Sequence, residues 1–102
     1  MLIRIVRMTF REEEVENFIK VFNASKQKIR SFPGCNHLEL HKDYNKDNVY
    51  ITYSHWDDED ALNNYRHSDL FKSVWAETKV LFADKPLAYS HRKVMTVDRE
   101  KE

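Results

Sequence analysis

The sequence predicts an α+β fold whose strands and helices follow the order βαββαβ. Three observations lead to this prediction: a long amphipathic helical stretch between two strand-like segments, a third strand-like segment that alternates aromatic and β-branched residues, and a second helical stretch ended by proline. A chain of 102 residues has room for one domain. We expect that domain to be residues 1–97, followed by a frayed tail at residues 98–102.

A strand and a long helix come first. Leu2 to Phe10 is rich in Ile, Val, Met and Phe, which is typical of a strand covered on both faces. Arg11 to Ser31 predicts an amphipathic helix that opens with glutamates, closes with basic residues and ends at Pro33-Gly34. Its apolar residues recur at helical spacing: Val15, Phe18, Ile19, Phe22 and Ile29.

Two strands joined by a hairpin loop should follow. Cys35 to Asp43 alternates polar and apolar residues, as expected of a half-buried strand. Tyr44 to Asn48 is rich in turn residues and predicts the hairpin loop. Val49 to Trp56 is the third predicted strand.

A broken helix and a last strand complete the chain. A cluster of carboxylates predicts a short helix over Asp58 to Arg66 with Asp57 as its N-cap. Ser68 should cap a second helix from Asp69 to about Phe82. Leu87 to Val97 is predicted to be the fourth strand.

This order is typical of the ferredoxin-like fold, in which helices cover one face of a four-stranded antiparallel sheet. The other face would be left bare, and large apolar patches rarely stay exposed. Side chains of the first and third strands should point away from the helices if Thr52 and Trp56 point toward them. These are Ile3, Ile5, Val49, Ile51 and Tyr53. We therefore predict a homodimer that packs sheet against sheet, with the last strand reaching toward its partner.

Charge and composition argue against several classes of partner. Seventeen basic and seventeen acidic residues cancel, so no basic field would attract nucleic acid. No apolar run approaches the roughly 20 residues that span a bilayer, so no membrane partner is expected. The lone Cys35 and the charged N-terminal strand predict a reducing, cytoplasmic setting.

The histidines do not predict a metal site. On a strand, His37 and His41 would stand roughly 13 Å apart, too far to share one ion. His37 and Glu39 would be neighbours at about 7 Å on one face. They fit either a proton relay or a row that faces solvent or a partner.

Four motifs resemble the antibiotic biosynthesis monooxygenase (ABM) domain over nearly the whole chain. They are Pro33-Gly34, the strand Tyr50 to Trp56, the helix start Asp58 to Leu62, and the cap Ser68 to Phe71. The resemblance implies a dimeric α+β barrel with a ligand cavity between the sheet and the helices of each subunit. It does not settle the chemistry, because one fold hosts many reactions.

The resemblance also implies a reaction and residues for it. Family oxygenases act on a small electron-rich aromatic, such as a quinol or phenolic polyketide, with O₂ and without metal or tightly bound flavin. In that branch a strand Asn and a Trp four residues later bind the substrate; here these positions are Thr52 and Trp56. Trp56 would stack or hydrogen-bond, Thr52 and Ser54 would orient the substrate, and Arg4 would stabilise an oxyanion.

A haem-degrading branch of the same family fits less well. Its Asn, Trp and His positions correspond to Val6, Tyr65 and Trp75 here, and an indole cannot ligate iron. Together with Phe71, these three residues are predicted to form the wall of a substrate pocket.

A second hypothesis stays open. Aromatic residues at these spacings fill cores as readily as they line cavities. The chain would then be a non-catalytic dimeric module that binds a small molecule or acts in a stress response. A fully packed space between Trp56, Tyr65 and Trp75 would exclude both small-molecule functions.

Overall fold

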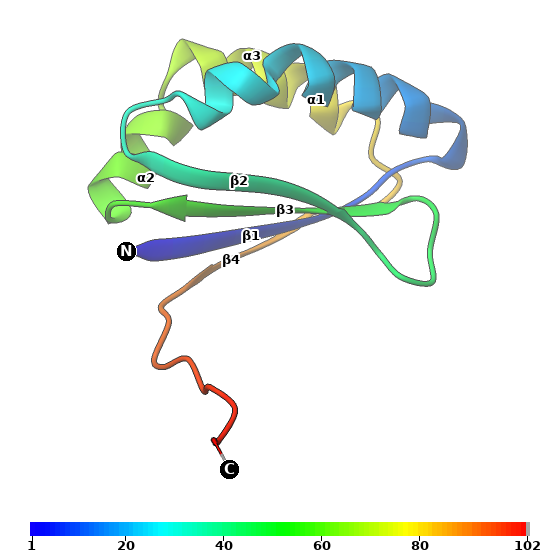
Figure 1. Cartoon of the computed structure of the whole chain (residues 1–102). Helices are drawn as coiled ribbons and strands as arrows, with labels where there is room; N and C mark the ends of the chain where they lie inside the picture. Colours follow the sequence, from blue (N-terminus) through cyan, green and yellow to red (C-terminus); the bar gives the residue numbers. More distant parts are fainter. Residues whose placement is uncertain (102) are drawn as a thin grey trace.

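The computed structural model describes residues 1–101 and has the predicted α+β architecture. The strands are β1 (Leu2–Thr9), β2 (Cys35–Lys42), β3 (Val49–Trp56) and β4 (Leu87–His91). The helices are the 3-10 helix η1 (Glu12–Glu14), α1 (Val15–Arg30), α2 (Glu59–Arg66) and α3 (Asp69–Lys79). The strands form one antiparallel sheet in the order β2-β3-β1-β4, and the helices lie on one of its faces (Figure 1). This is the ferredoxin-like arrangement.

Two apolar clusters hold the helices on the sheet. The first consists of buried Met8, Phe10, Phe18 and Leu81. The second, at the other end of the sheet, consists of buried Cys35, Trp56 and Leu62. Burial of this apolar surface is the main term that stabilises the layers.

The cap of α2 differs from the prediction. Asp58, not Asp57, is the N-cap: its backbone is extended and its side chain accepts the N–H of Ala61 at 2.8 Å. Asp57 instead lies in the bend directly after β3, where its carboxylate accepts from the Asn36 amide at 2.7 Å. The helix dipole favours either carboxylate as the N-cap, so the dipole alone does not choose between Asp57 and Asp58. The contact with Asn36, which is distant in the sequence, engages Asp57 and leaves Asp58 as the cap. The predicted Ser68 cap is confirmed, since its hydroxyl accepts the N–H of Phe71.

The last helix and the last strand are both shorter than predicted. Helix α3 ends at Lys79 because the following backbone bonds to the end of β1: Arg11 N–H donates to the Leu81 carbonyl at 3.0 Å, and Ala83 N–H donates to the Thr9 carbonyl at 2.9 Å. Strand β4 ends at His91, which pairs with Ile3 near the start of β1. Strand β1 begins only one residue before Ile3, so the chain after His91 has almost no strand left to pair with. Residues 92–101 run away from the sheet (Figure 1).

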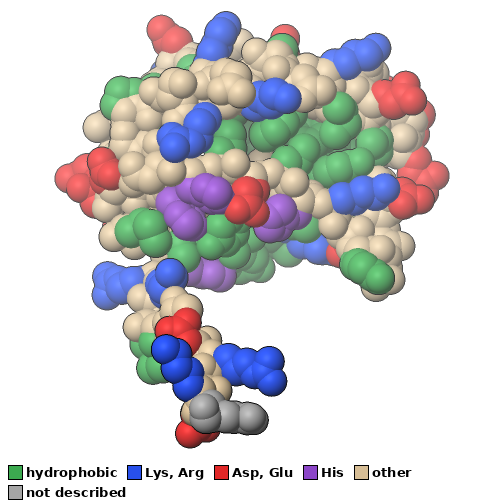
Figure 2. All heavy atoms as spheres, viewed as in Figure 1, with side chains coloured by type: hydrophobic (Ala, Val, Ile, Leu, Met, Phe, Trp, Pro, Cys, Tyr) green, Lys and Arg blue, Asp and Glu red, His purple; other side chains and the backbone are tan. Residues whose placement is uncertain are grey.

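On the open face of the sheet, the strand register aligns side chains in three rows that cross all four strands. The first row is His37, His55, Ile3 and His91; the second is Glu39, Tyr53, Ile5 and Tyr89; the third is His41, Ile51, Arg7 and Leu87. Figure 2 shows histidines gathered beside an acidic side chain on the β2 side of the molecule. No helix within residues 1–101 is long and apolar enough to cross a membrane.

Candidate functional site

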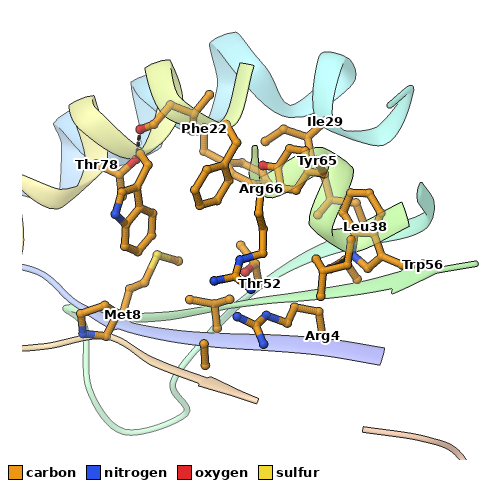
Figure 3. Close-up of a pocket in the computed structure, with 18 of the residues that line it drawn as sticks. Arg4, Met8, Phe22, Ile29, Leu38, Thr52, Trp56, Tyr65, Arg66 and Thr78 are labelled. Carbon is orange, nitrogen blue, oxygen red and sulfur yellow. Dashed lines mark hydrogen bonds between the residues drawn. The ribbon is translucent and has the colours of Figure 1, made fainter. Parts of the chain in front are cut away.

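A cavity of about 340 Å³ lies between the sheet and the helices (Figure 3). Its wall includes members of both apolar clusters, so the cavity separates them. All eight residues that the sequence singled out line it: Arg4, Val6, Thr52, Ser54, Trp56, Tyr65, Phe71 and Trp75. Their roles remain predictions, but the space between them is hollow, not packed.

One wall of the cavity is a continuous series of aromatic rings. Trp56 stacks on Tyr65 with ring centroids 4.9 Å apart, and Tyr65 meets Phe71 edge-on at 5.2 Å. Phe71 stacks on Trp75 at 5.7 Å. These rings come from β3, α2 and α3, so the wall forms only when all three elements are in place. A flat apolar ligand would find ring faces and edges to pack against.

Ser54 satisfies the single polar group of the Trp56 side chain. Both point toward the helices because they are two residues apart on β3, and the indole N–H donates to the Ser54 hydroxyl at 2.9 Å. Trp56 is 1% exposed. Its N–H is therefore already committed, and Trp56 supports the aromatic wall by stacking on Tyr65 while leaving a ligand little of its own ring to contact.

Two arginines supply the positive charge of the cavity. Arg4 comes from β1 and Arg66 from the last turn of α2, and both guanidinium groups point into the space beside Thr52 (Figure 3). Burial, and then the nearby charge of Arg66, lower the pKa of Arg4 from its usual value. Arg4 also donates to the Ser90 hydroxyl at 3.0 Å, which ties it to β4.

No ionisable residue that lines the cavity within residues 1–101 is a base at neutral pH. Besides the two arginines, only Tyr65 can ionise, and burial raises the pKa of its phenol. Tyr65 thus stays protonated and can donate a hydrogen bond. The cavity can hold an aromatic molecule and stabilise negative charge on it.

Sequence reasoning missed Arg66. A basic residue at the end of a helix complements the helix dipole, which is reason enough for an arginine there. Its entry into the cavity depends on the angle at which α2 meets β3, and no spacing in the sequence encodes that angle. Other lining residues that were not predicted include Leu38, Pro86 and Ala88.

The four strand histidines, His37, His41, His55 and His91, lie on the opposite face of the sheet from this cavity. Glu39 bridges two of them: one carboxylate oxygen contacts His37 Nε2, and the other contacts His41 Nε2 at 2.6 Å. These hydrogen bonds lower the pKa of Glu39 from its usual value. Within residues 1–101, no three His, Cys, Asp or Glu side chains are placed to hold a metal ion.

Comparison with known proteins identifies one family by its sequence model. The family model described as "Antibiotic biosynthesis monooxygenase" matches residues 1–76. No curated protein matches the chain.

Several solved structures share the fold. An antibiotic biosynthesis monooxygenase is 17% identical with a TM-score of 0.87, covering 93% of this chain and 100% of that one. A conserved protein from Methanosarcina mazei Go1 is 19% identical with a TM-score of 0.85, covering 91% and 93%. A Caulobacter crescentus CB15 protein with the same family name is 22% identical with a TM-score of 0.85, covering 92% and 90%.

Proposed function

The chain belongs to the antibiotic biosynthesis monooxygenase family, and from that premise we propose that it is a monooxygenase that oxidises a small electron-rich phenol or quinol with O₂. The observation that carries the proposal is the aromatic-walled cavity beside Arg4. A ring held there would be shielded from water, and a guanidinium would stabilise its anion.

For a phenol, the proposed reaction balances without a further reductant. Arg4 stabilises the phenolate, and the proton passes to solvent because the cavity offers no base. The phenolate gives one electron to O₂, and the resulting superoxide and aryloxyl radical join through a C–O bond at a ring carbon. Cleavage of the O–O bond then leaves a quinone. One oxygen atom enters the ring, and the other leaves as water with the hydrogens of the phenol O–H and the ring C–H.

Thr52 and Trp56 position the ring in this scheme. Thr52 provides one hydroxyl where the family oxygenases use an amide, so it makes fewer hydrogen bonds to the substrate. Trp56 supports Tyr65, whose ring it stacks on, and the Ser54 hydroxyl holds the Trp56 indole in place.

Oxygen uptake with a panel of phenols and quinols tests the proposal. We expect one O₂ consumed per quinone formed from a phenol, and a loss of about 100-fold or more in kcat/KM for Arg4→Gln. Lys20→Gln, an exposed change on α1 with the same loss of charge, should keep full activity. No turnover across the panel, with Trp56→Phe behaving as the parent, would contradict the proposal.

A second candidate is a non-catalytic binding module with the same cavity. The substitution of Thr52 for the family's Asn and the lack of a base in the cavity favour it. Tight ligand binding without oxygen uptake would identify this function.

We also propose that the chain acts as a homodimer that packs its open sheet faces together. Ile3 and Val49, which we expected to contribute, are already buried within one chain at 8% and 2% exposure. The available apolar surface is half-buried Ile5, Ile51 and Tyr53, with exposed Leu87 and Tyr89 added by β4. Full burial stabilises by about 1.5 to 3 kcal/mol for each side chain, and side chains that are already half-buried gain about half of that. These ten residues of two chains would therefore contribute on the order of 8 to 15 kcal/mol, comparable with an association cost of about 4 to 15 kcal/mol.

A further inference from the structure

Among the residues that the structure describes, the two cavity arginines have no negative partner. Among residues 1–101, no carboxylate lies within 4.0 Å of Arg4 or Arg66, although five other ion pairs form. No Asp or Glu lines the cavity in the same part of the chain. Two like charges therefore share one partly dehydrated space, which is unfavourable until an anion enters.

Arginines elsewhere on the folded body find protein partners. Arg7 binds the Asp43 carboxylate at 3.2 Å, Arg11 donates to the Val80 carbonyl at 2.9 Å, and Arg30 donates to the Cys35 carbonyl at 2.8 Å. Arg4 makes one side-chain hydrogen bond, to Ser90, and within residues 1–101 Arg66 makes none. Each guanidinium carries five N–H donors, so most donors facing the cavity remain available.

We propose that the natural substrate is an aromatic hydroxy acid, whose carboxylate binds Arg66 while its phenolate faces Arg4. The assignment of the phenolate rests on the proposed oxygenase function; the carboxylate site does not. Arg66 is exposed and Arg4 is half-buried, so the carboxylate remains nearer to solvent while the reacting ring lies deeper.

The shape of the site agrees with this class of ligand. A cavity of about 340 Å³ is near the lower end of the range of roughly 300 to 1,000 Å³ for ligand pockets, which suits one or two fused rings. The aromatic wall matches the ring, and a planar guanidinium matches a carboxylate through two parallel hydrogen bonds.

Anaerobic calorimetric titration at pH 7.5 tests the carboxylate site without catalysis. The probes are 1-hydroxy-2-naphthoate and 6-hydroxy-2-naphthoate, which place the two groups adjacent and at opposite ends, each paired with its neutral carboxamide. We expect at least one acid to bind tenfold or more tighter than its amide, as a charge-assisted contact would give. Equal affinity within both pairs would overturn the proposal, as would inorganic phosphate binding as tightly as the better acid.

Variants locate the contact. Arg66→Gln should weaken the better acid by about tenfold or more and its amide by less than about threefold. Arg66→Lys should recover part of the loss because it keeps the charge without the planar fork. Lys20→Gln is the control for net charge. A thermal unfolding midpoint near that of the parent shows that Arg66→Gln is folded, and an equal loss for acid and amide would overturn the assignment.

Binding and oxygen uptake, measured together, separate the carboxylate site from the oxygenase reaction. Selective binding of the acid without oxygen uptake supports the carboxylate site and rejects the reaction. Oxygen uptake with equal kcat/KM for acids and neutral phenols supports the reaction and rejects the carboxylate site.

Discussion

The two faces of the sheet are built from the same strands and have opposite characters. On β3, Thr52, Ser54 and Trp56 face the helices and the cavity, while the alternate residues Ile51, Tyr53 and His55 face away. The covered face has few polar groups, and Ser54 and Trp56 bond to each other. The open face carries histidines, tyrosines and a carboxylate that remain partly in contact with solvent.

Successive side chains of β3 point to opposite faces, so the cavity and the proposed dimer interface can be changed separately. A change at one position should act on the cavity, and a change at the next should act on the proposed assembly. Neighbouring residues of β3 therefore make matched controls for each other.

The largest effect on folding is expected from Trp56→Ala. Removing this buried indole leaves a void beside Leu62 and Cys35, and we expect a loss of about 3 to 5 kcal/mol in the free energy of unfolding. His55→Ala, one residue away on the open face, should cost less than about 1 kcal/mol in the monomer. Urea unfolding followed by circular dichroism compares them, and similar losses would break the distinction between the faces.

The largest effect on assembly is expected from Ile51→Asp. A carboxylate buried between two sheets has a desolvation cost of several kcal/mol, and its row neighbour Arg7, already paired with Asp43, offsets only part of it, so the dimer dissociation constant should rise about 10-fold or more. Thr52→Asp places the same carboxylate on the cavity side, where it should leave the dimer intact and compete with an acidic ligand for Arg4 and Arg66. Sedimentation equilibrium measures both variants. A monomeric parent at micromolar concentration would show that the open face is not an interface.

A smaller effect on stability should follow from Ser54→Ala. It leaves the buried indole N–H of Trp56 without its acceptor, at a cost of about 1 to 3 kcal/mol. The matched change Tyr53→Phe removes a hydroxyl that contacts His55 Nε2 at 3.0 Å on the open face, where water can replace it. We expect Tyr53→Phe to cost less than about 0.5 kcal/mol in the monomer. Guanidinium unfolding curves measure the loss of stability in both variants, and equal losses would contradict the expected difference.

The smallest effect concerns pH. Burial, and then the charges of His37 and Lys93, lower the pKa of His55 from its usual 6.5, while Glu39 opposes this shift. The unfolded chain therefore binds this proton more readily than the folded chain. The stabilising contribution is complete above about pH 6.5 and declines below it.

For this partly exposed group we expect a decrease of less than about 1 kcal/mol between pH 7.5 and 5.5. Thermal unfolding across this range measures the change, and His55→Gln should flatten it. Glu39, whose pKa is also lowered, adds stability above its usual 4.5 that is lost only at more acid pH. An unchanged slope in His55→Gln would assign the pH effect to other groups.

Element order and strand faces could be predicted because hydrophobic periodicity encodes them directly. Thr52 and Trp56 share a face by even spacing, and the structure places both at the cavity. Element ends depended on distant partners instead. Strand β4 ends near the point where the antiparallel β1 begins, and α3 ends before Leu81 and Ala83, whose backbones bond to Arg11 and Thr9. The position of Arg66 at the cavity could not be predicted because it also depends on a tertiary contact, namely how α2 is placed on the sheet.

The turn at Gly34 determines that placement. Its φ of 90° lies in the region that favours glycine, and a Cβ there would stand 2.5 Å from the Ala61 Cβ of α2. Helix α2 thus approaches the turn closely because Gly34 and Ala61 are the two smallest residues, and neither of them lines the cavity. A bulkier residue at either position would lift the helix and carry Arg66 away from Arg4. The size of molecule that the protein accepts can therefore drift during evolution, or be adjusted by design, through residues that never touch that molecule.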